Sequence, residues 1–117
     1  MATRLLIVDD HESFRRLATR LLREAGFDVV GQAADGASAL RETKRLQPDL
    51  VLLDIVLPDM SGFEVAAAIA DGVATAQIVL TSSRAPSDLG SEWPEGCVFV
   101  PKHELTAARL RAAFGSA

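Results

Sequence analysis

The sequence predicts a single α/β domain over residues 1–117, in which a doubly wound, five-stranded parallel sheet carries helices on both faces. Short apolar runs alternate with segments of helical periodicity along the whole chain, which is typical of βα units that build a parallel sheet. A chain of 117 residues is long enough for one hydrophobic core but too short for two domains of ordinary size.

Five apolar runs provide the expected strands, at residues 5–8, 29–33, 50–53, 78–80 and 98–100. The runs are apolar at nearly every position because a parallel strand covered by helices is buried on both faces. The third, Leu50-Val51-Leu52-Leu53, is the most apolar of them.

Four segments of helical character separate or follow these strands. The first runs from about Phe14 to Ala25, and Gly26 follows where a left-handed residue would end it. The second covers about residues 37–46, with Asp35 and Gly36 at its start and Pro48 after its end. The third begins at Ser61, where Ser61 and Glu64 have the spacing of a capping box, and ends near Gly72. The last covers about residues 106–114 and presents Leu110, Ala113 and Phe114 on the side opposite Arg109 and Arg111.

The segment between the fourth and fifth strands breaks this regularity. Residues 84–96 contain Pro86, Gly90, Pro94 and Gly96, which interrupt helices. We therefore expect the fourth helix of the doubly wound arrangement to be short or irregular.

Charge and cysteine content predict the cellular compartment and exclude some kinds of binding partner. The formal net charge is -4, and no run of Lys or Arg is long enough to follow the phosphates of a nucleic acid, so direct nucleic-acid binding is not expected. A single cysteine, Cys97, favours a reducing compartment. The first ten residues resemble neither a signal peptide nor a membrane span, and we expect a cytoplasmic protein without membrane contact.

Polar residues follow four of the predicted strands. Asp9 and Asp10 end the first strand, Asp54 ends the third, Thr81 ends the fourth and Lys102 follows the fifth. The carboxyl ends of parallel strands meet at one edge of the sheet, where sites of this fold lie. Three crowded carboxylates repel one another unless a divalent cation neutralises them, and an oxygen-rich site suits Mg2+.

This set of side chains fits phosphoryl transfer to a carboxylate. An aspartate can attack phosphorus and form an acyl phosphate. The transfer needs positive charge and hydrogen-bond donors around the phosphoryl oxygens. Mg2+ would supply the first cation and Lys102 the second, and the Thr81 hydroxyl would donate a hydrogen bond to a remaining oxygen.

The same residues resemble the response-regulator receiver family of two-component signalling, which includes the bacterial chemotaxis regulator. The likeness covers nearly the whole chain and is most specific in Leu6-Ile7-Val8-Asp9-Asp10-His11 and in residues 49–62, where Pro58 and Gly62 match the family's turn. It implies a flavodoxin-like sheet of strand order 2-1-3-4-5. It further implies that Asp54 is the phosphoacceptor and that Asp9, Asp10, Asp54 and the backbone carbonyl of Val56 hold Mg2+. Thr81 and Phe99 would be the switch residues, and Lys102 would stabilise the phosphoryl group.

By this resemblance the chain is a signalling receiver that assists only its own phosphorylation and dephosphorylation, and is otherwise not an enzyme. A sensor histidine kinase or a phosphotransfer protein would donate the phosphoryl group. A downstream effector or an attached output domain would respond, and the receiver would be a monomer or a phosphorylation-dependent dimer. The positions two residues after Asp54 and after Thr81 influence hydrolysis in this family. Here they are Val56 and Ser83, which cannot position a water as a carboxylate or an amide would, so we expect slow self-dephosphorylation.

Other interpretations exist for the same residues. Each residue also has a purely structural interpretation: Asp10 as a helix cap, Lys102 as a surface charge, Thr81 as a strand former and Phe99 as a core residue. A receiver-fold interaction module that works without phosphorylation is the main alternative function. A Mg2+-dependent phosphohydrolase ranks last, because such enzymes usually have a second acid two positions after the nucleophile, where this chain has Val56. Trp93 either covers the edge of the core or belongs to a partner surface.

Overall fold

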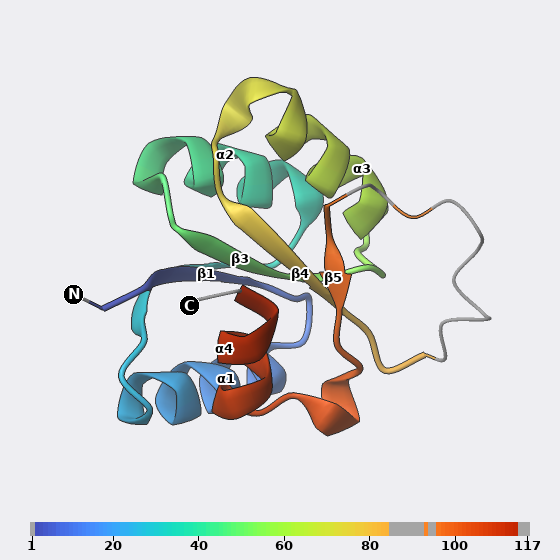
Figure 1. The fold of residues 1–117 in the computed structure, drawn as a ribbon. Helices are drawn as coiled ribbons and strands as arrows, with labels where there is room; N and C mark the ends of the chain where they lie inside the picture. The colour runs from blue at the N-terminus through green and yellow to red at the C-terminus, as the bar shows by residue number, and fades with distance from the viewer. Residues whose placement is uncertain (1, 85–92, 94–95, 115–117) are drawn as a thin grey trace.

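A parallel sheet forms the centre of the molecule (Figure 1). The structure is a computed structural model that describes residues 2–84, 93 and 96–114. The strand order is β2-β1-β3-β4-β5, and all neighbouring strands pair in parallel. The strands are β1 (Arg4–Val8), β2 (Asp28–Ala33), β3 (Leu50–Asp54), β4 (Gln77–Thr81) and β5 (Val98–Phe99). The predicted strand number and order are confirmed, and each predicted strand lies within one residue of the observed bounds.

Helices cover both faces of this sheet, as predicted. Helices α2 (Gly36–Leu46) and α3 (Gly62–Ala68) lie on one face, and α1 (Glu12–Glu24) and α4 (Ala107–Phe114) lie on the other (Figure 1). A π-helical turn, Ile69–Val73, extends α3, and a short 3-10 helix, Lys102–Glu104, precedes α4. The observed α1 begins two residues before the predicted start, and α4 begins one residue after it.

Side chains of the central strands point alternately into two cores. Leu6, Val51 and Leu80 belong to the core beneath α2 and α3, whereas Leu5 and Leu52 belong to the core beneath α1 and α4. All five are at most 1% exposed. This period of two explains why the strands read as continuous apolar runs in the sequence.

Local sequence signals set the ends of the helices. The Asp35 carboxylate caps α2 by accepting a 2.8 Å hydrogen bond from the Ser38 N–H. The Ser61 hydroxyl caps α3 by accepting a 3.0 Å bond from the Phe63 N–H. Gly26, which follows α1, and Gly72, within the turn after α3, have φ of 99° and 124°, in the left-handed region that glycine tolerates.

The predicted short or irregular fourth helix lies largely outside the described residues, because residues 85–92 and 94–95 are not among them. Trp93 is described, and its ring packs against Phe63 and Phe99 at the edge of the core beneath α2 and α3. The structure therefore supports the interpretation of Trp93 as a cover for the edge of the core.

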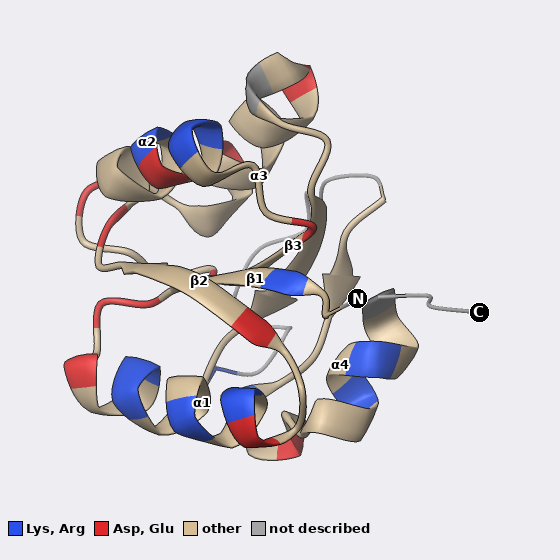
Figure 2. Ribbon diagram, turned by 90° about the vertical axis from the view of Figure 1, so that its left-hand side faces the viewer, with Lys and Arg blue, Asp and Glu red and all other residues tan. Residues whose placement is uncertain are grey.

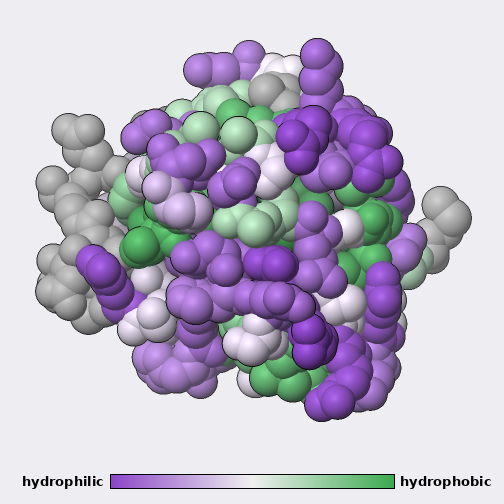
Figure 3. Space-filling model, turned by 180° about the vertical axis from the view of Figure 1, so that it is seen from behind, coloured by the Kyte–Doolittle hydropathy of each residue, from purple (hydrophilic) through white to green (hydrophobic). Residues whose placement is uncertain are grey.

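Lys and Arg residues lie along the outer helices α1, α2 and α4 (Figure 2). On the face shown in Figure 3, hydrophilic side chains surround small, separate apolar patches. Among the described residues no helix is both long and apolar enough to span a lipid bilayer.

Candidate functional site

The polar residues predicted at the strand ends converge at one edge of the sheet. Asp54 and Thr81 are direct neighbours, because they pair in the register of β3 and β4. The Lys102 N–H donates a 3.0 Å hydrogen bond to the Ser82 carbonyl, which holds the start of the 3-10 helix against the end of β4. Asp9 follows β1, next to β3 at the point where the strand order reverses. The site therefore lies at the switch point, where ligands bind in doubly wound folds.

Lys102 joins the two buried carboxylates of the site. Its Nζ atom lies 2.6 Å from Asp9 Oδ2 and 3.2 Å from Asp54 Oδ2. The ammonium also lies 4.5 Å from the centre of the Phe14 ring, in cation–π contact. Phe14 in α1 thus helps to hold the lysine over the site. This role could not be predicted, since Phe14 follows the apolar pattern of a core residue.

Burial and mutual repulsion set the charge of the carboxylates. The Asp54 side chain is only 4% exposed, and this burial, together with the nearby charge of Asp9, raises its pKa to about 6. Burial acts in the same direction on Asp9, but hydrogen bonds from Lys102 and the His11 N–H outweigh it and lower the pKa of Asp9. Desolvation would lower the pKa of Lys102, but the two aspartates raise it above its ordinary value. The lysine therefore remains charged.

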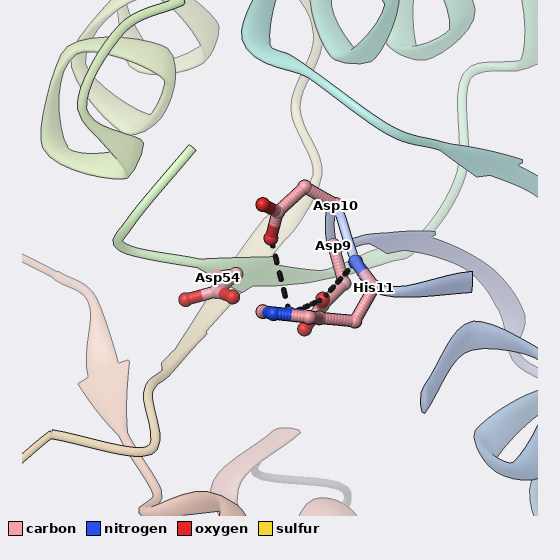
Figure 4. A group of neighbouring side chains, drawn as sticks. All are labelled: Asp9, Asp10, His11 and Asp54. Atoms are coloured by element: carbon pink, nitrogen blue, oxygen red, sulfur yellow. Dashed lines mark hydrogen bonds and ion pairs between the residues drawn. The ribbon is translucent and has the colours of Figure 1, made fainter. Parts of the chain in front are cut away.

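Asp10 and His11 complete the cluster (Figure 4). His11 Nδ1 lies 3.1 Å from Asp9 Oδ1 and 3.2 Å from Asp10 Oδ1. The His11 N–H also donates a 2.8 Å hydrogen bond to Asp9 Oδ1. The His11 side chain is 64% exposed, and its contact with both acids was not predicted. The turn that leads into α1 orients the His11 ring toward the two carboxylates, and the residue types alone do not specify the shape of this turn.

The donor set fits a hard divalent cation. Ligand atoms of Asp9, Asp10, His11 and Asp54 all lie within 4.8 Å of one another. Three carboxylates share this small volume with Lys102, so the site keeps an excess of negative charge when all three are ionised. Burial is the main cause of the raised pKa of Asp54, and the nearby charge of Asp9 adds to it. Carboxylate oxygens in this number suit Mg2+.

Thr81 contributes a buried hydroxyl to the site. The residue is fully buried, and its Oγ1 atom has no hydrogen-bond partner among the described residues. An unsatisfied buried hydroxyl costs about 1–3 kcal/mol, so such groups usually have a functional reason. A ligand oxygen beside Asp54 would satisfy it.

The loop after β3 fixes the surroundings of Asp54. The Val56 N–H donates a 3.1 Å hydrogen bond to Asp54 Oδ1, and Val56 bridges to Ser61 across the loop. Gly62 donates a 2.7 Å hydrogen bond to the Ile55 carbonyl, and any Cβ at Gly62 would collide with the backbone of Asp54 and Ile55. Glycine is therefore required there for the loop to pack against the backbone of Asp54.

Asp59 in the same loop has a role that the sequence did not reveal. Its carboxylate accepts hydrogen bonds from the N–H groups of Gly36 and Ala37, at 2.7 and 2.9 Å. These bonds lower the pKa of Asp59 and join the loop to the first turn of α2. No local signal marks this contact, because the partners are 22 and 23 residues apart in the chain.

Phe99 lies beside the site on β5, where it pairs with Leu80, the residue before Thr81. Its ring meets Trp93 edge to face, with ring centres 5.1 Å apart, and Trp93 meets Phe63 of α3 in the same way at 5.0 Å. The ring of Phe99 is thus held at the edge of the core by a row of aromatic contacts.

Comparison with known proteins agrees with this fold. The family of the response regulator receiver domain matches residues 5–96. A putative transcriptional regulator from Pseudomonas aeruginosa is 36% identical over 95% of this chain and 55% of its own length. The chemotaxis protein CheY from Bacillus subtilis is 40% identical over 71% of this chain and 69% of its own. A solved CheY-like response regulator receiver domain from Methylobacillus flagellatus has a TM-score of 0.83 and 26% identity, with 99% of this chain and 98% of that one covered.

The chain belongs to the response regulator receiver domain family. Members of this family are signalling domains of two-component systems, and in response regulators they work with histidine kinases and output domains. Some relatives, such as protein-glutamate methylesterases, are enzymes through other domains. The chain spans about half the length of the first curated relatives it matches, 55% of one and 40% of another.

Proposed function

We propose that this receiver takes a phosphoryl group onto Asp54 from a phosphohistidine of a sensor kinase or phosphotransfer protein, and that the modification changes its contacts with a downstream partner. The observation that carries the proposal is the contact of Lys102 with both Asp9 and Asp54, beside the Thr81 hydroxyl, which has no hydrogen-bond partner in the described part of the chain. A phosphoryl group on Asp54 would meet both a cation and a hydrogen-bond donor.

In the proposed step, a carboxylate oxygen of Asp54 attacks phosphorus and the P–N bond to the donor imidazole breaks. The imidazole keeps the electron pair of that bond and takes a proton, while the new P–O bond makes an acyl phosphate. Asp54 must be ionised to attack, and its pKa of about 6 leaves it largely ionised at neutral pH. The Val56 N–H, bound to Asp54 Oδ1, fixes the orientation of the carboxylate.

Asp9, Asp10, Asp54 and the Val56 carbonyl are the proposed ligands of Mg2+. When bound, Mg2+ supplies positive charge to the phosphoryl oxygens as negative charge builds up on them. The acidic cluster supports this proposal by its hard oxygen donors and by its excess of negative charge.

Lys102 and Thr81 are the proposed phosphoryl-stabilising residues. The modification adds close to two negative charges at neutral pH. Lys102 Nζ already touches Asp54 and would move from Asp9 toward the phosphoryl group. Thr81 would donate its hydroxyl to the same group. Phe99 would then move inward beside Thr81, which would alter its contact with Trp93 and change the partner surface near β5.

The test is direct modification of the purified chain. Incubation with Mg2+ and acetyl phosphate should add one phosphoryl group that resists acid and is lost in base, as measured by intact mass. Asp54→Asn should abolish the adduct. Asp71→Asn, at an exposed acid on the turn after α3, should keep it.

Other outcomes would favour the alternatives. If no adduct forms in the presence of Mg2+, the chain is better described as an interaction module that works without phosphorylation. If phosphate is released continuously from a phosphoester substrate, the chain is a phosphohydrolase.

A further inference from the structure

The loop after β3 is fixed at its tip as well as at its base. At the base, the Val56 N–H donates a 3.1 Å hydrogen bond to the Asp54 carboxylate. At the tip, the Asp59 carboxylate accepts hydrogen bonds from the start of α2. We propose that Asp59 is a positioning residue for phosphoryl acceptance: by joining this loop to α2, it holds the main chain of Val56 in place against Asp54. The part of this proposal that concerns phosphoryl acceptance rests on the proposed function.

The loop is short enough for its tip to set the position of its base. Val56 and Ser61 form an antiparallel bridge, so only residues 57–60 lie between the two sides of the loop. One of these residues is Pro58, whose ring restricts the backbone. A displacement of the tip is therefore passed on to Val56, because the loop has little freedom to absorb it.

Asp59 supplies an anion that the first turn of α2 lacks. That turn contains no acidic residue, and the N-cap residue Asp35 accepts the N–H of Ser38. Asp59 accepts the N–H groups of the two preceding residues, Gly36 at 2.7 Å and Ala37 at 2.9 Å. These bonds lower the pKa of Asp59, so its carboxylate is ionised at neutral pH and the bonds are charge-assisted. The contact between the loop and α2 is thus made by strong hydrogen bonds.

Packing beside these bonds brings the tip of the loop close to α2. Gly36 has no side chain, and a Cβ at this position would collide with Met60. Met60 follows Asp59 and packs, partly buried, against the core beneath α2 and α3. The strand before α2 is itself fixed at the site, because the carbonyl of Ala33 accepts a 3.0 Å hydrogen bond from the Asp9 N–H. Asp59 therefore joins the loop to a part of the molecule that is already anchored beside Asp9.

A role in helix capping alone and a role in positioning predict different results. Asp35 and Asp59 carry the same charge and cap the same helix, but only Asp59 belongs to the loop after β3. Asp35→Ala is therefore the matched control for Asp59→Ala. Both variants should unfold at a lower urea concentration than the wild type, because each removes a cap of α2. Only Asp59→Ala should also slow phosphoryl acceptance.

The rate of adduct formation gives the first test. The full 117-residue chain is incubated with acetyl phosphate and saturating Mg2+, and the adduct on Asp54 is followed by intact mass. Asp59→Ala should lower the rate about tenfold, because a displaced reacting group loses its favourable orientation, whereas Asp35→Ala should change the rate less than about twofold. Asp59→Asn keeps one oxygen acceptor and should give an intermediate rate. Equal rates in Asp59→Ala and Asp35→Ala would refute the proposal.

Amide exchange tests the position of the loop without phosphorylation. In the metal-free protein, hydrogen–deuterium exchange of the Val56 N–H reports how often its bond to Asp54 opens. Asp59→Ala should speed this exchange, whereas Asp35→Ala should speed exchange at Ser38 and leave Val56 unchanged. An unchanged exchange rate of Val56 in Asp59→Ala would contradict the proposal. If Asp59→Ala folds poorly, Asp59→Asn gives the same comparison.

The two proposals fail in different experiments. Absence of a phosphoryl adduct on the wild-type chain with Mg2+ would overturn the proposed function, while exchange at Val56 would still decide whether Asp59 holds the loop. A normal adduct on the wild type, together with an unchanged rate and unchanged exchange in Asp59→Ala, would overturn only the role of Asp59.

Discussion

Lys102 Nζ lies closer to Asp9 Oδ2, at 2.6 Å, than to Asp54 Oδ2, at 3.2 Å. The receiver thus keeps Lys102 mainly on Asp9, which follows β1, and leaves the Asp54 carboxylate only partly neutralised. This division agrees with the opposite directions of the two pKa shifts, which are lowered at Asp9 and raised at Asp54.

Replacement of Lys102 tests this arrangement. Lys102→Met removes the cation between two buried carboxylates, so we expect the metal-free protein to lose about 2–4 kcal/mol of unfolding free energy at neutral pH. Mg2+ should restore much of the loss, because it supplies the missing positive charge. Urea denaturation with and without Mg2+ measures both effects. Lys44→Met, at an exposed position of α2, is the control, and a similar loss in both variants would contradict the prediction.

Asp54→Asn should have the opposite effect. Burial raises the pKa of Asp54 from 3.8 to about 6, so ionisation of this group opposes folding at neutral pH. Each pKa unit corresponds to ~1.4 kcal/mol, so ionisation of Asp54 lowers the unfolding free energy of the folded protein by about 3 kcal/mol. We therefore expect Asp54→Asn to stabilise the metal-free protein by about 1–3 kcal/mol.

The pH dependence of this gain follows from the sign of the shift. The pKa of Asp54 is higher in the folded protein than in the unfolded chain. The stability that comes from protonation of Asp54 is therefore fully present below pH 3.8 and is lost as the pH rises through about 6. The advantage of Asp54→Asn should therefore shrink as pH falls from 6 toward 4, and thermal melts across this range measure it. An advantage that does not depend on pH would show that the carboxylate charge is not its cause.

The sequence predicted the sheet and the position of the site because both depend on local patterns. Continuous apolar runs identify buried parallel strands, and the residues at the carboxyl ends of these strands lie at the same edge of the sheet. Asp54, Thr81 and Lys102 could therefore be assigned to one site from the sequence alone. The contact of Asp59 with the start of α2 and that of Phe14 with Lys102 could not be predicted, because each joins segments far apart in the chain through the orientation of a side chain.

Thr81→Val isolates the role of the buried hydroxyl. Valine has nearly the same shape and removes a polar atom that lacks a partner among the described residues, so the unmodified protein should be unchanged or more stable by about 1 kcal/mol. The adduct on Asp54 should still form, but the change in Trp93 fluorescence that we expect on phosphorylation should be smaller. Thr81→Ser, which keeps the hydroxyl, should respond as the wild type does. A clear loss of stability in Thr81→Val would mean that the hydroxyl is satisfied in the unmodified state.

Trp93 offers a readout of that change. It is the single tryptophan of a chain without tyrosine, and its ring packs edge to face on Phe99. If Phe99 moves inward on phosphorylation, the environment of Trp93 changes and its fluorescence should shift when acetyl phosphate and Mg2+ are added. Phe99→Leu should remove most of the shift while the adduct still forms. An unchanged emission in the phosphorylated wild type would contradict a switch through Phe99.

The lifetime of the phosphoryl group tests the loop after β3. Val56 is 40% exposed and its N–H binds the Asp54 carboxylate, but its apolar side chain offers no group that could align an attacking water. We therefore expect the isolated chain to lose its phosphoryl group slowly after the donor is removed. Val56→Asn introduces an amide that can orient a water, and should speed the loss severalfold. Val56→Leu, which keeps an apolar side chain, should leave the rate near that of the wild type. Mass measurements over time give all three rates, and equal rates in Val56→Asn and Val56→Leu would show that water alignment at this position does not limit hydrolysis.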